Sequence, residues 1–170
     1  MGQIEVTRTY LQLTEPGRLV GAPAPALPVR IERVLQCPAS FFRYLYAEVG
    51  RAHHWVDRAR WTDDEIRAYL AQPAVGLWVM WGEGAPAGYY ELMRHPDGAI
   101  EIAYFGLLPE FHGQGLGKYL LTAAVEEAWR LGASRVWLHT CTLDDPAALP
   151  NYRARGFEAF ETETYWTEKA

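Results

Sequence analysis

The sequence lacks the features that would place the protein outside the cell or in a membrane. Its two cysteines, Cys37 and Cys141, are too few for a disulfide framework and do not have the spacing of a zinc site. The chain shows no basic segment followed by an apolar run, and no apolar run approaches the ~18 residues of a membrane-spanning helix. We therefore expect a cytoplasmic protein with reduced thiols, no signal peptide, no membrane partner and no bound metal.

Positive charge is also scarce relative to negative charge. The 16 lysines and arginines stand against 21 aspartates and glutamates, which gives a formal net charge of −5. Proteins that bind nucleic acid normally present a basic surface, so this composition argues against a nucleic-acid partner. The length of 170 residues, with 49% hydrophobic residues, is typical of one globular domain that can bury a core without disulfides or metal.

One compositionally biased stretch divides the chain. Residues 21–28 read Gly-Ala-Pro-Ala-Pro-Ala-Leu-Pro, and prolines cannot donate the backbone hydrogen bonds of a helix or a central strand. The pattern predicts an extended connector, preceded by a short strand around residues 4–11. We therefore expect an N-terminal strand with a Pro-rich connector over residues 1–28 and a single domain over residues 29–168.

Hydrophobic periodicity predicts the elements of that domain. Strands are expected at residues 29–34, 76–81, 88–93, 100–108, 135–141 and 157–166, and helices at 38–48, 62–71, 115–131 and 146–154. Antiparallel strands come first, and an alternation of strands and helices follows. This order predicts a mixed sheet with helices on its faces, an α/β (α+β) fold.

A glycine-rich segment carries the clearest chemical signal. Residues 112–118 read His-Gly-Gln-Gly-Leu-Gly-Lys and lie between a predicted buried strand and the longest predicted helix. Glycines allow the backbone to pass close to a ligand, and the free amides at a helix N-terminus attract phosphate. The segment therefore predicts a site for an anionic, phosphorylated ligand.

Two common phosphate motifs do not fit this segment. A dinucleotide fingerprint would need glycine where Lys118 stands. A P-loop would need glycine at His112 and serine or threonine at Tyr119. A glycine-rich turn without a ligand remains open as the alternative.

Three motifs in order resemble the GNAT superfamily of acyl-CoA-dependent N-acyltransferases. His112-x-x-Gly115-x-Gly117 is similar to the family's pyrophosphate loop, with histidine in place of arginine or glutamine. The strand Glu101–Leu108 is similar to the family strand that precedes this loop. Tyr152-x-x-x-Gly156-Phe157 is similar to a family motif whose tyrosine faces the sulfur of CoA, and the resemblance covers residues 29–157.

This resemblance implies a fold, a co-substrate and its contacts. The fold would be a GNAT-type mixed, mostly antiparallel sheet that splays after the fourth family strand, with helices on both faces. Acetyl-CoA would be the co-substrate, without a metal. The residues expected at it are Leu107, Leu108, His112, Gly113, Gln114, Gly115, Leu116, Gly117, Lys118 and Asn151, with a main-chain amide of Leu107 or a neighbour facing the thioester oxygen.

The resemblance also implies a mechanism of acetyl transfer to a primary amine. Glu101 would be the general base, directly or through water, because a carboxylate among apolar neighbours is a better proton acceptor. Tyr152 would protonate the departing CoA thiolate. A charge at the strand edge and a core aromatic residue are the respective structural alternatives.

Several alternatives of function remain open at this point. The acceptor is expected to be a small amine or a basic peptide, including a protein N-terminus or lysine, and the protein is a possible homodimer. A non-catalytic acyl-CoA-binding module would keep the glycine loop without catalysis.

Other residues with reactive or charged side chains are expected to be structural. His53 and His54 lie in a polar loop and are expected in solvent, with a base role as the second interpretation. His139 is expected in the core, Cys141 as buried filler, and Arg58 in solvent.

Overall fold

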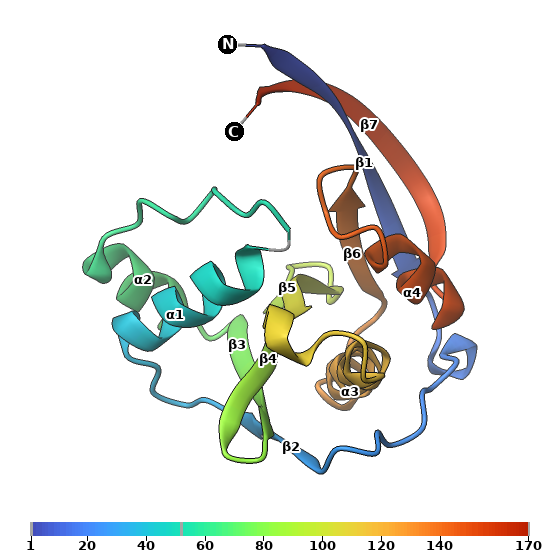
Figure 1. The fold of residues 1–170 in the computed structure, drawn as a ribbon. Coiled ribbons are helices and arrows are strands. Elements are labelled where there is room, and N and C mark those ends of the chain that lie inside the picture. The colour runs from blue at the N-terminus through green and yellow to red at the C-terminus, as the bar shows by residue number, and fades with distance from the viewer. Residues whose placement is uncertain (1, 52, 170) are drawn as a thin grey trace.

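The computed structural model describes residues 2–51 and 53–169, and one seven-stranded sheet forms its centre. The strand order is β2-β3-β4-β5-β6-β1-β7 (Figure 1). The strands are β1 (Gln3–Leu13), β2 (Val29–Arg33), β3 (Val75–Gly82), β4 (Ala85–Arg94), β5 (Ile100–Leu107), β6 (Val136–Cys141) and β7 (Glu158–Glu168). All neighbouring pairs are antiparallel except β5 and β6. The predicted mixed, mostly antiparallel sheet is confirmed.

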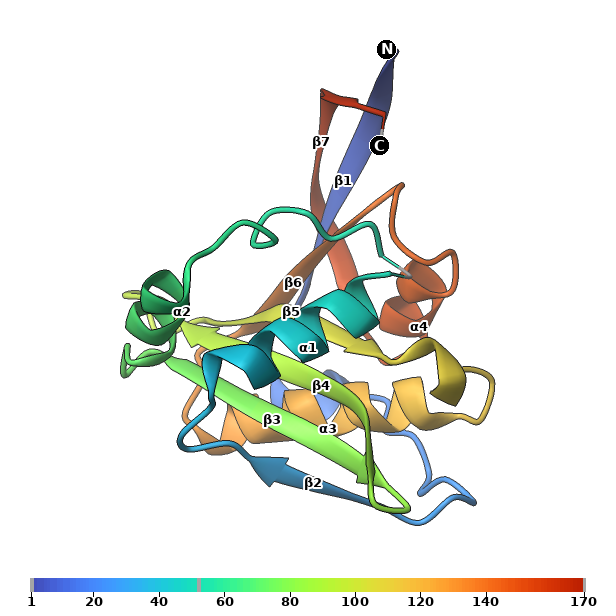
Figure 2. The ribbon, with the colours of Figure 1, turned by 60° about the vertical axis from the view of Figure 1, so that its left-hand side comes forward.

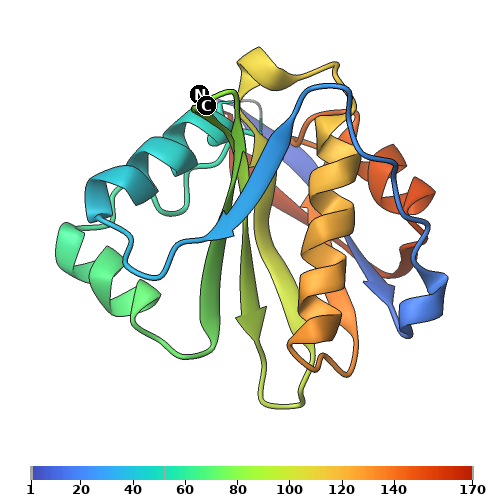
Figure 3. The ribbon, with the colours of Figure 1, turned by 90° about the horizontal axis from the view of Figure 1, so that it is seen from below.

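The helices cover both faces of this sheet, as expected. α1 (Ala39–Gly50) and α2 (Asp63–Leu70) lie on one face, and α3 (Leu116–Arg130) lies on the other (Figure 3). α4 (Ala148–Ala154) contacts α3. Short 3₁₀ turns occur at Pro16–Arg18 and Pro109–Phe111. Among the residues described, no helix is both long and apolar enough to cross a membrane.

Two hydrophobic cores, one on each face of the sheet, hold the helices against the strands. The buried stripe of α3 packs against β4, β5 and β6, and its members are Leu116, Leu120, Leu121, Ala124, Val125 and Ala128. On the other face, Leu45 and Val49 of α1 pack against Leu77 and Val79 of β3. Each buried leucine or valine among them contributes about 1.5–3 kcal/mol, so both helices are held firmly against the strands between them.

The sheet splays between β5 and β6. Their parallel pairing is limited to Ile100 with Val136 and Glu101 with Trp137, and the strands separate beyond it. A β-bulge at Ala103, which has no partner in β4, accompanies this separation. Because a bulge breaks the two-residue alternation, Glu101 and Tyr104 come to lie on the same face of β5. The splay implied by the family resemblance is therefore present.

The N-terminal strand occupies a place that the sequence does not indicate. β1 lies between β6 and β7, so that Tyr10 pairs with His139 on one side and Glu161 on the other. The N-terminal strand expected within residues 1–28 is thus a strand of the same sheet as β6 and β7. β1 and β7 run side by side and extend away from the helices (Figures 1 and 2).

Candidate active site

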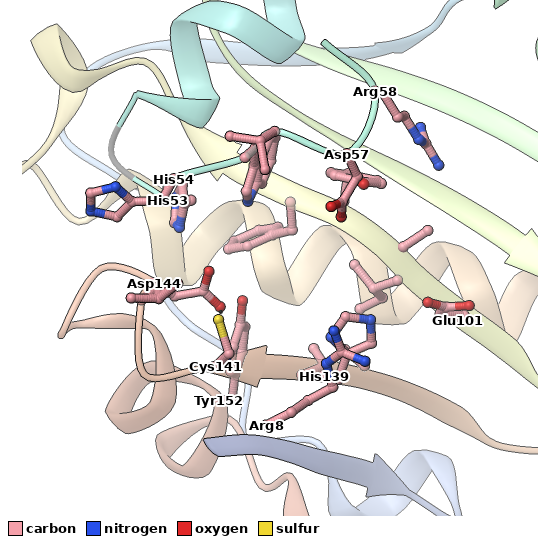
Figure 4. A pocket seen from close by; sticks show the side chains of 18 of the residues that line it. Arg8, His53, His54, Asp57, Arg58, Glu101, His139, Cys141, Asp144 and Tyr152 are labelled. Atoms are coloured by element: carbon pink, nitrogen blue, oxygen red, sulfur yellow. Dashed lines mark hydrogen bonds between the residues drawn. The ribbon is translucent and has the colours of Figure 1, made fainter. Parts of the chain in front are cut away.

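Two cavities lie at the splay and meet there. One, of about 560 Å³, lies at the N-terminus of α3, and we call it the cofactor cavity. The other, of about 430 Å³, lies between β5, β6 and the loop from α1 to α2, and we call it the acceptor cavity (Figure 4). Three residues line both cavities: His53, Phe105 and Tyr152. A ligand in one cavity can therefore reach a ligand in the other at this junction.

The cofactor cavity contains the glycine-rich segment. Gly115 is the N-cap of α3 and has a left-handed φ of 74°, and no side chain caps the helix there. The first amides of an uncapped helix lack partners and carry partial positive charge, which is the chemistry that a pyrophosphate requires. The predicted residues that line this cavity are Leu107, His112, Gly113, Gly115, Leu116, Gly117, Lys118 and Asn151.

Two residues expected at the co-substrate lie elsewhere. Leu108 is packed beneath α1, and its amide donates to the carbonyl oxygen of Ala87 at 2.9 Å, so it has no hydrogen left for a ligand. Gln114 is exposed and lines neither cavity. Both residues follow the family spacing, but spacing alone does not reveal which amides the sheet has already paired.

Tyr152 projects from α4 into the junction and is 6% exposed. Its ring packs edge-on against Phe105 and Phe157, each with centroids 6.2 Å apart. Burial raises the pKa of the Tyr152 hydroxyl, and the carboxylate of Asp144 raises it further. The hydroxyl is therefore protonated at neutral pH and suited to donate a proton.

Glu101 lines the acceptor cavity at the end away from Tyr152 (Figure 4). Its carboxylate pairs with the imidazole Nε2 of His95 at 2.9 Å, and its side chain is 13% exposed. Glu101 pairs with Met93 of β4 and Phe105 pairs with Tyr90, so three steps along the partner strand, about 10 Å, separate Glu101 from the junction. Glu101 and Tyr152 therefore lie at different ends of the acceptor cavity.

The lining of the acceptor cavity leaves negative charge uncompensated. Asp57, Glu101 and Asp144 line it, together with two arginines. Each arginine is already engaged, because Arg8 pairs with Glu163 at 2.9 Å and Arg58 pairs with a buried glutamate. The arrangement suits a cationic acceptor.

Arg58 is buried, contrary to the expectation that it lies in solvent. Its guanidinium donates to both carboxylate oxygens of Glu91, at 3.1 and 2.8 Å, and to the hydroxyl of Tyr69 at 2.9 Å. It also stacks on the ring of Tyr104 at 4.1 Å. Although burial disfavours its charged form, Glu91 raises the pKa of Arg58. This ion pair fastens the loop after α1 to β4, and sequence could not reveal it because the partners are 33 residues apart.

We expect the variant Arg58→Met to lower the free energy of unfolding by about 3–5 kcal/mol, because it leaves the fully buried Glu91 without a counter-ion. The double variant Arg58→Met/Glu91→Leu should recover most of that loss. Denaturant unfolding measures both. Arg43→Met breaks an exposed ion pair with Asp63 and should change stability little. Equal losses in the single and double variants would contradict this account of the pair.

The alternation of side chains along β6 determines where His139 and Cys141 lie. Val136, Leu138 and Thr140 of β6 face the core, so His139 and Cys141 face the opposite side. After the pairing with β5 ends, that side opens into the acceptor cavity. His139 is consequently not a core residue, and Cys141, expected to be buried filler, is half-buried in the cavity wall. Partial burial lowers the pKa of His139, and Arg8 lowers it further.

Comparison with known proteins finds relatives among acetyltransferases. The profile of the Acetyltransferase (GNAT) family matches residues 41–157. An uncharacterized N-acetyltransferase of Mycobacterium tuberculosis is 31% identical over 97 residues, 57% of this chain and 62% of that protein. A mycothiol acetyltransferase of Saccharopolyspora erythraea is 27% identical, over 66% of this chain and 39% of that protein.

A solved structure extends the similarity over nearly the whole chain. A GCN5-related N-acetyltransferase from Kribbella flavida superposes with a TM-score of 0.67 and 27% identity, covering 97% of this chain and 59% of that one. The chain thus spans about three fifths or less of the length of these relatives. Since the family profile matches well over half of the chain, the protein belongs to the Acetyltransferase (GNAT) family.

Proposed function

We propose that this protein transfers the acetyl group of acetyl-CoA to the primary amine of a small molecule. The observation that carries the proposal is the junction at Tyr152 between a cavity with an uncapped helix N-terminus and a cavity with uncompensated carboxylates. Acetyl transfer needs this arrangement, because the thioester must be reached by an amine that arrives from the other side.

The cofactor cavity fits CoA, the thiol whose acetyl thioester the family uses. The amides at the start of α3 would hold the pyrophosphate, and Asn151 lines the path from that helix to Tyr152. Among residues 2–51 and 53–169, no three histidine, cysteine, aspartate or glutamate side chains come together as metal ligands.

The acceptor cavity favours a small molecule over a protein chain. Its volume of about 430 Å³ lies within the range of small-ligand sites, and the loop from α1 to α2 forms one of its walls. Asp57, Glu101 and Asp144 would attract an ammonium group. A protein N-terminus or lysine would need a groove that admits the flanking backbone.

In the proposed mechanism, Glu101 accepts the first proton of the ammonium through water. The neutral nitrogen attacks the thioester carbonyl at the junction, where a main-chain amide of Leu107 or a neighbour faces the developing negative charge on oxygen. The Tyr152 hydroxyl donates its proton to the departing thiolate.

We expect Gly117→Val to abolish binding of CoA without unfolding the protein. Gly117 is in helical conformation, and its nearest neighbour beyond adjacent residues, Leu107 Cδ1, would be 3.7 Å from a Cβ, so the added methyls project into the cofactor cavity. At a CoA concentration of 100 times the dissociation constant, wild-type protein should gain about 2.7 kcal/mol, roughly 5–10 °C in melting temperature. The Gly117→Val protein should show no such gain.

The control is Gly17→Val, in a turn with open space around it and outside both cavities, which should keep the full shift. A normal shift in Gly117→Val would remove the cofactor cavity from the proposal. Release of free thiol from acetyl-CoA, measured with a panel of small amines and basic peptides, tests the reaction itself. Binding of CoA without turnover of any acceptor would favour a non-catalytic acyl-CoA-binding module.

A further inference from the structure

His53 stands at the junction of the two cavities, together with Tyr152, and the mechanism above does not use it. Its backbone amide donates to the carbonyl of Gly50, the last residue of α1, at 3.0 Å. Its ring stacks on Trp55 with centroids 5.2 Å apart, and Trp55 packs edge-on against Tyr104 of β5 at 4.8 Å. The imidazole is therefore held in place by packing on both the loop and the strand.

Gly106 of β5 has no side chain beyond hydrogen, and this allows the imidazole of His53 to approach the strand. A Cβ added at Gly106 would lie 2.9 Å from Nε2 of His53, closer than real Cβ atoms approach other atoms. Glycine at this position thus brings a ring nitrogen to the backbone of the splayed strand, beside Phe105. The thioester carbonyl of the proposed function reacts at this strand.

The surroundings of His53 favour its neutral form. Partial burial lowers the pKa of His53, and His112 and His54 lower it further, whereas Asp144 and Asp145 act in the opposite direction. A histidine whose pKa is lowered is neutral at every pH above that value and accepts a proton there. At neutral pH the junction therefore contains one protonated phenol and one unprotonated imidazole.

The reaction has a place for a second group that relays a proton. An ammonium nitrogen carries three protons and the product amide nitrogen carries one, so two protons leave the nitrogen. The first leaves before attack and passes through water to Glu101. The second leaves after the N–C bond has formed, when the nitrogen is at the junction and about 10 Å of strand away from Glu101.

We propose that His53 accepts this second proton from the nitrogen and passes it to the Tyr152 phenolate. This inference rests on the proposed function. The nitrogen electron pair forms the N–C bond, the C–S bond breaks, and the Tyr152 hydroxyl protonates the thiolate. The nitrogen then gives its second proton to the imidazole, and the imidazolium reprotonates the Tyr152 phenolate. The balance is one ammonium and one acetyl thioester converted to an amide, a thiol and the single proton carried away by Glu101.

The test compares His53→Gln and His53→Ala with Arg60→Gln, which changes an exposed side chain of the same loop that lines neither cavity. We expect His53→Gln to lower kcat by about 10²-fold, with the KM for the amine and the CoA-induced melting shift close to wild type. Free imidazole should restore part of the activity of His53→Ala, more at a pH where imidazole is neutral. Arg60→Gln should stay within about twofold of wild type.

A measurement independent of turnover uses the histidine ring resonances in nuclear magnetic resonance. The His53 ring should titrate below the ordinary histidine value of about 6.5 and shift when CoA is added, because the ring lines the cofactor cavity. His95, which lines neither cavity, should not shift on addition of CoA.

Wild-type kcat in His53→Gln, or a loss confined to KM, would overturn the proposal and show that His53 only shapes the cavity. The same holds if imidazole gives no rescue of His53→Ala. In those cases the proposed function stands as long as wild-type protein acetylates an amine. If wild-type protein acetylates no amine, the proposed function itself fails, and the assignment of His53 fails with it.

Discussion

Glu101→Gln should lower kcat/KM for an amine by ~10²–10⁴ at neutral pH, the largest effect expected for any single side chain of this site. The amide keeps the shape and the position of the side chain beside His95 but cannot accept a proton. Because free amine becomes abundant as the pH approaches the pKa of the substrate ammonium, the loss should shrink at high pH. Steady-state rates between pH 6 and pH 10 measure this dependence.

The matched control is Glu32→Gln on β2, which removes one carboxylate that is 57% exposed and far from both cavities. It should leave the rate and its pH dependence unchanged. A Glu101→Gln protein with the wild-type pH profile would show that Glu101 is not the base. A constant loss at all pH values would instead indicate that Glu101 binds the acceptor rather than takes its proton.

Tyr152→Phe should lower kcat by ~10²-fold or more while leaving the fold and the affinity for CoA nearly unchanged. The variant removes only the hydroxyl, and the ring retains its packing against Phe105 and Phe157. Burial keeps this phenol protonated, as its raised pKa indicates, so the wild-type protein has a proton ready when the C–S bond breaks. Turnover with acetyl-CoA, followed by thiol release, measures the loss.

Leaving-group dependence separates an acid from a packing residue. Acetyl thioesters with more acidic thiols need the proton less, so Tyr152→Phe should slow them less than it slows acetyl-CoA. Tyr90→Phe, a buried tyrosine of the same core that lines neither cavity, should affect all donors little. An equal penalty for every thiol would contradict proton donation by Tyr152.

Much of the fold was predictable because its signals are local. Alternation marks the strands, the helical stripe marks α3, and Thr62 with Glu65 forms the capping box expected at the start of α2. The glycine-rich segment was also predictable, because glycine spacing and a following helix are both visible in sequence. The order of the motifs then indicated the family and the splay.

The pairing of distant residues could not be predicted in this way. The partner of Arg58 is a glutamate on β4, and His139 leaves the core only because β5 diverges from β6. His53 belongs to a loop whose composition predicts solvent, yet Gly106 on a remote strand admits its ring. Each of these facts depends on which segments the fold brings together, and none leaves a periodic signal.

The position of β1 has a consequence for the order in which the protein is synthesised and folded. Residues of β1 pair with β6 and β7, and the partners Arg8 and Glu163 are 155 positions apart. The ribosome makes this strand early, and it must wait for almost the entire domain before its two neighbours exist. During that interval its apolar residues, among them Val6, Leu11 and Leu13, have no final burial site. The sheet therefore closes only after translation of β7, and until then the exposed first strand is a site at which aggregation competes with folding.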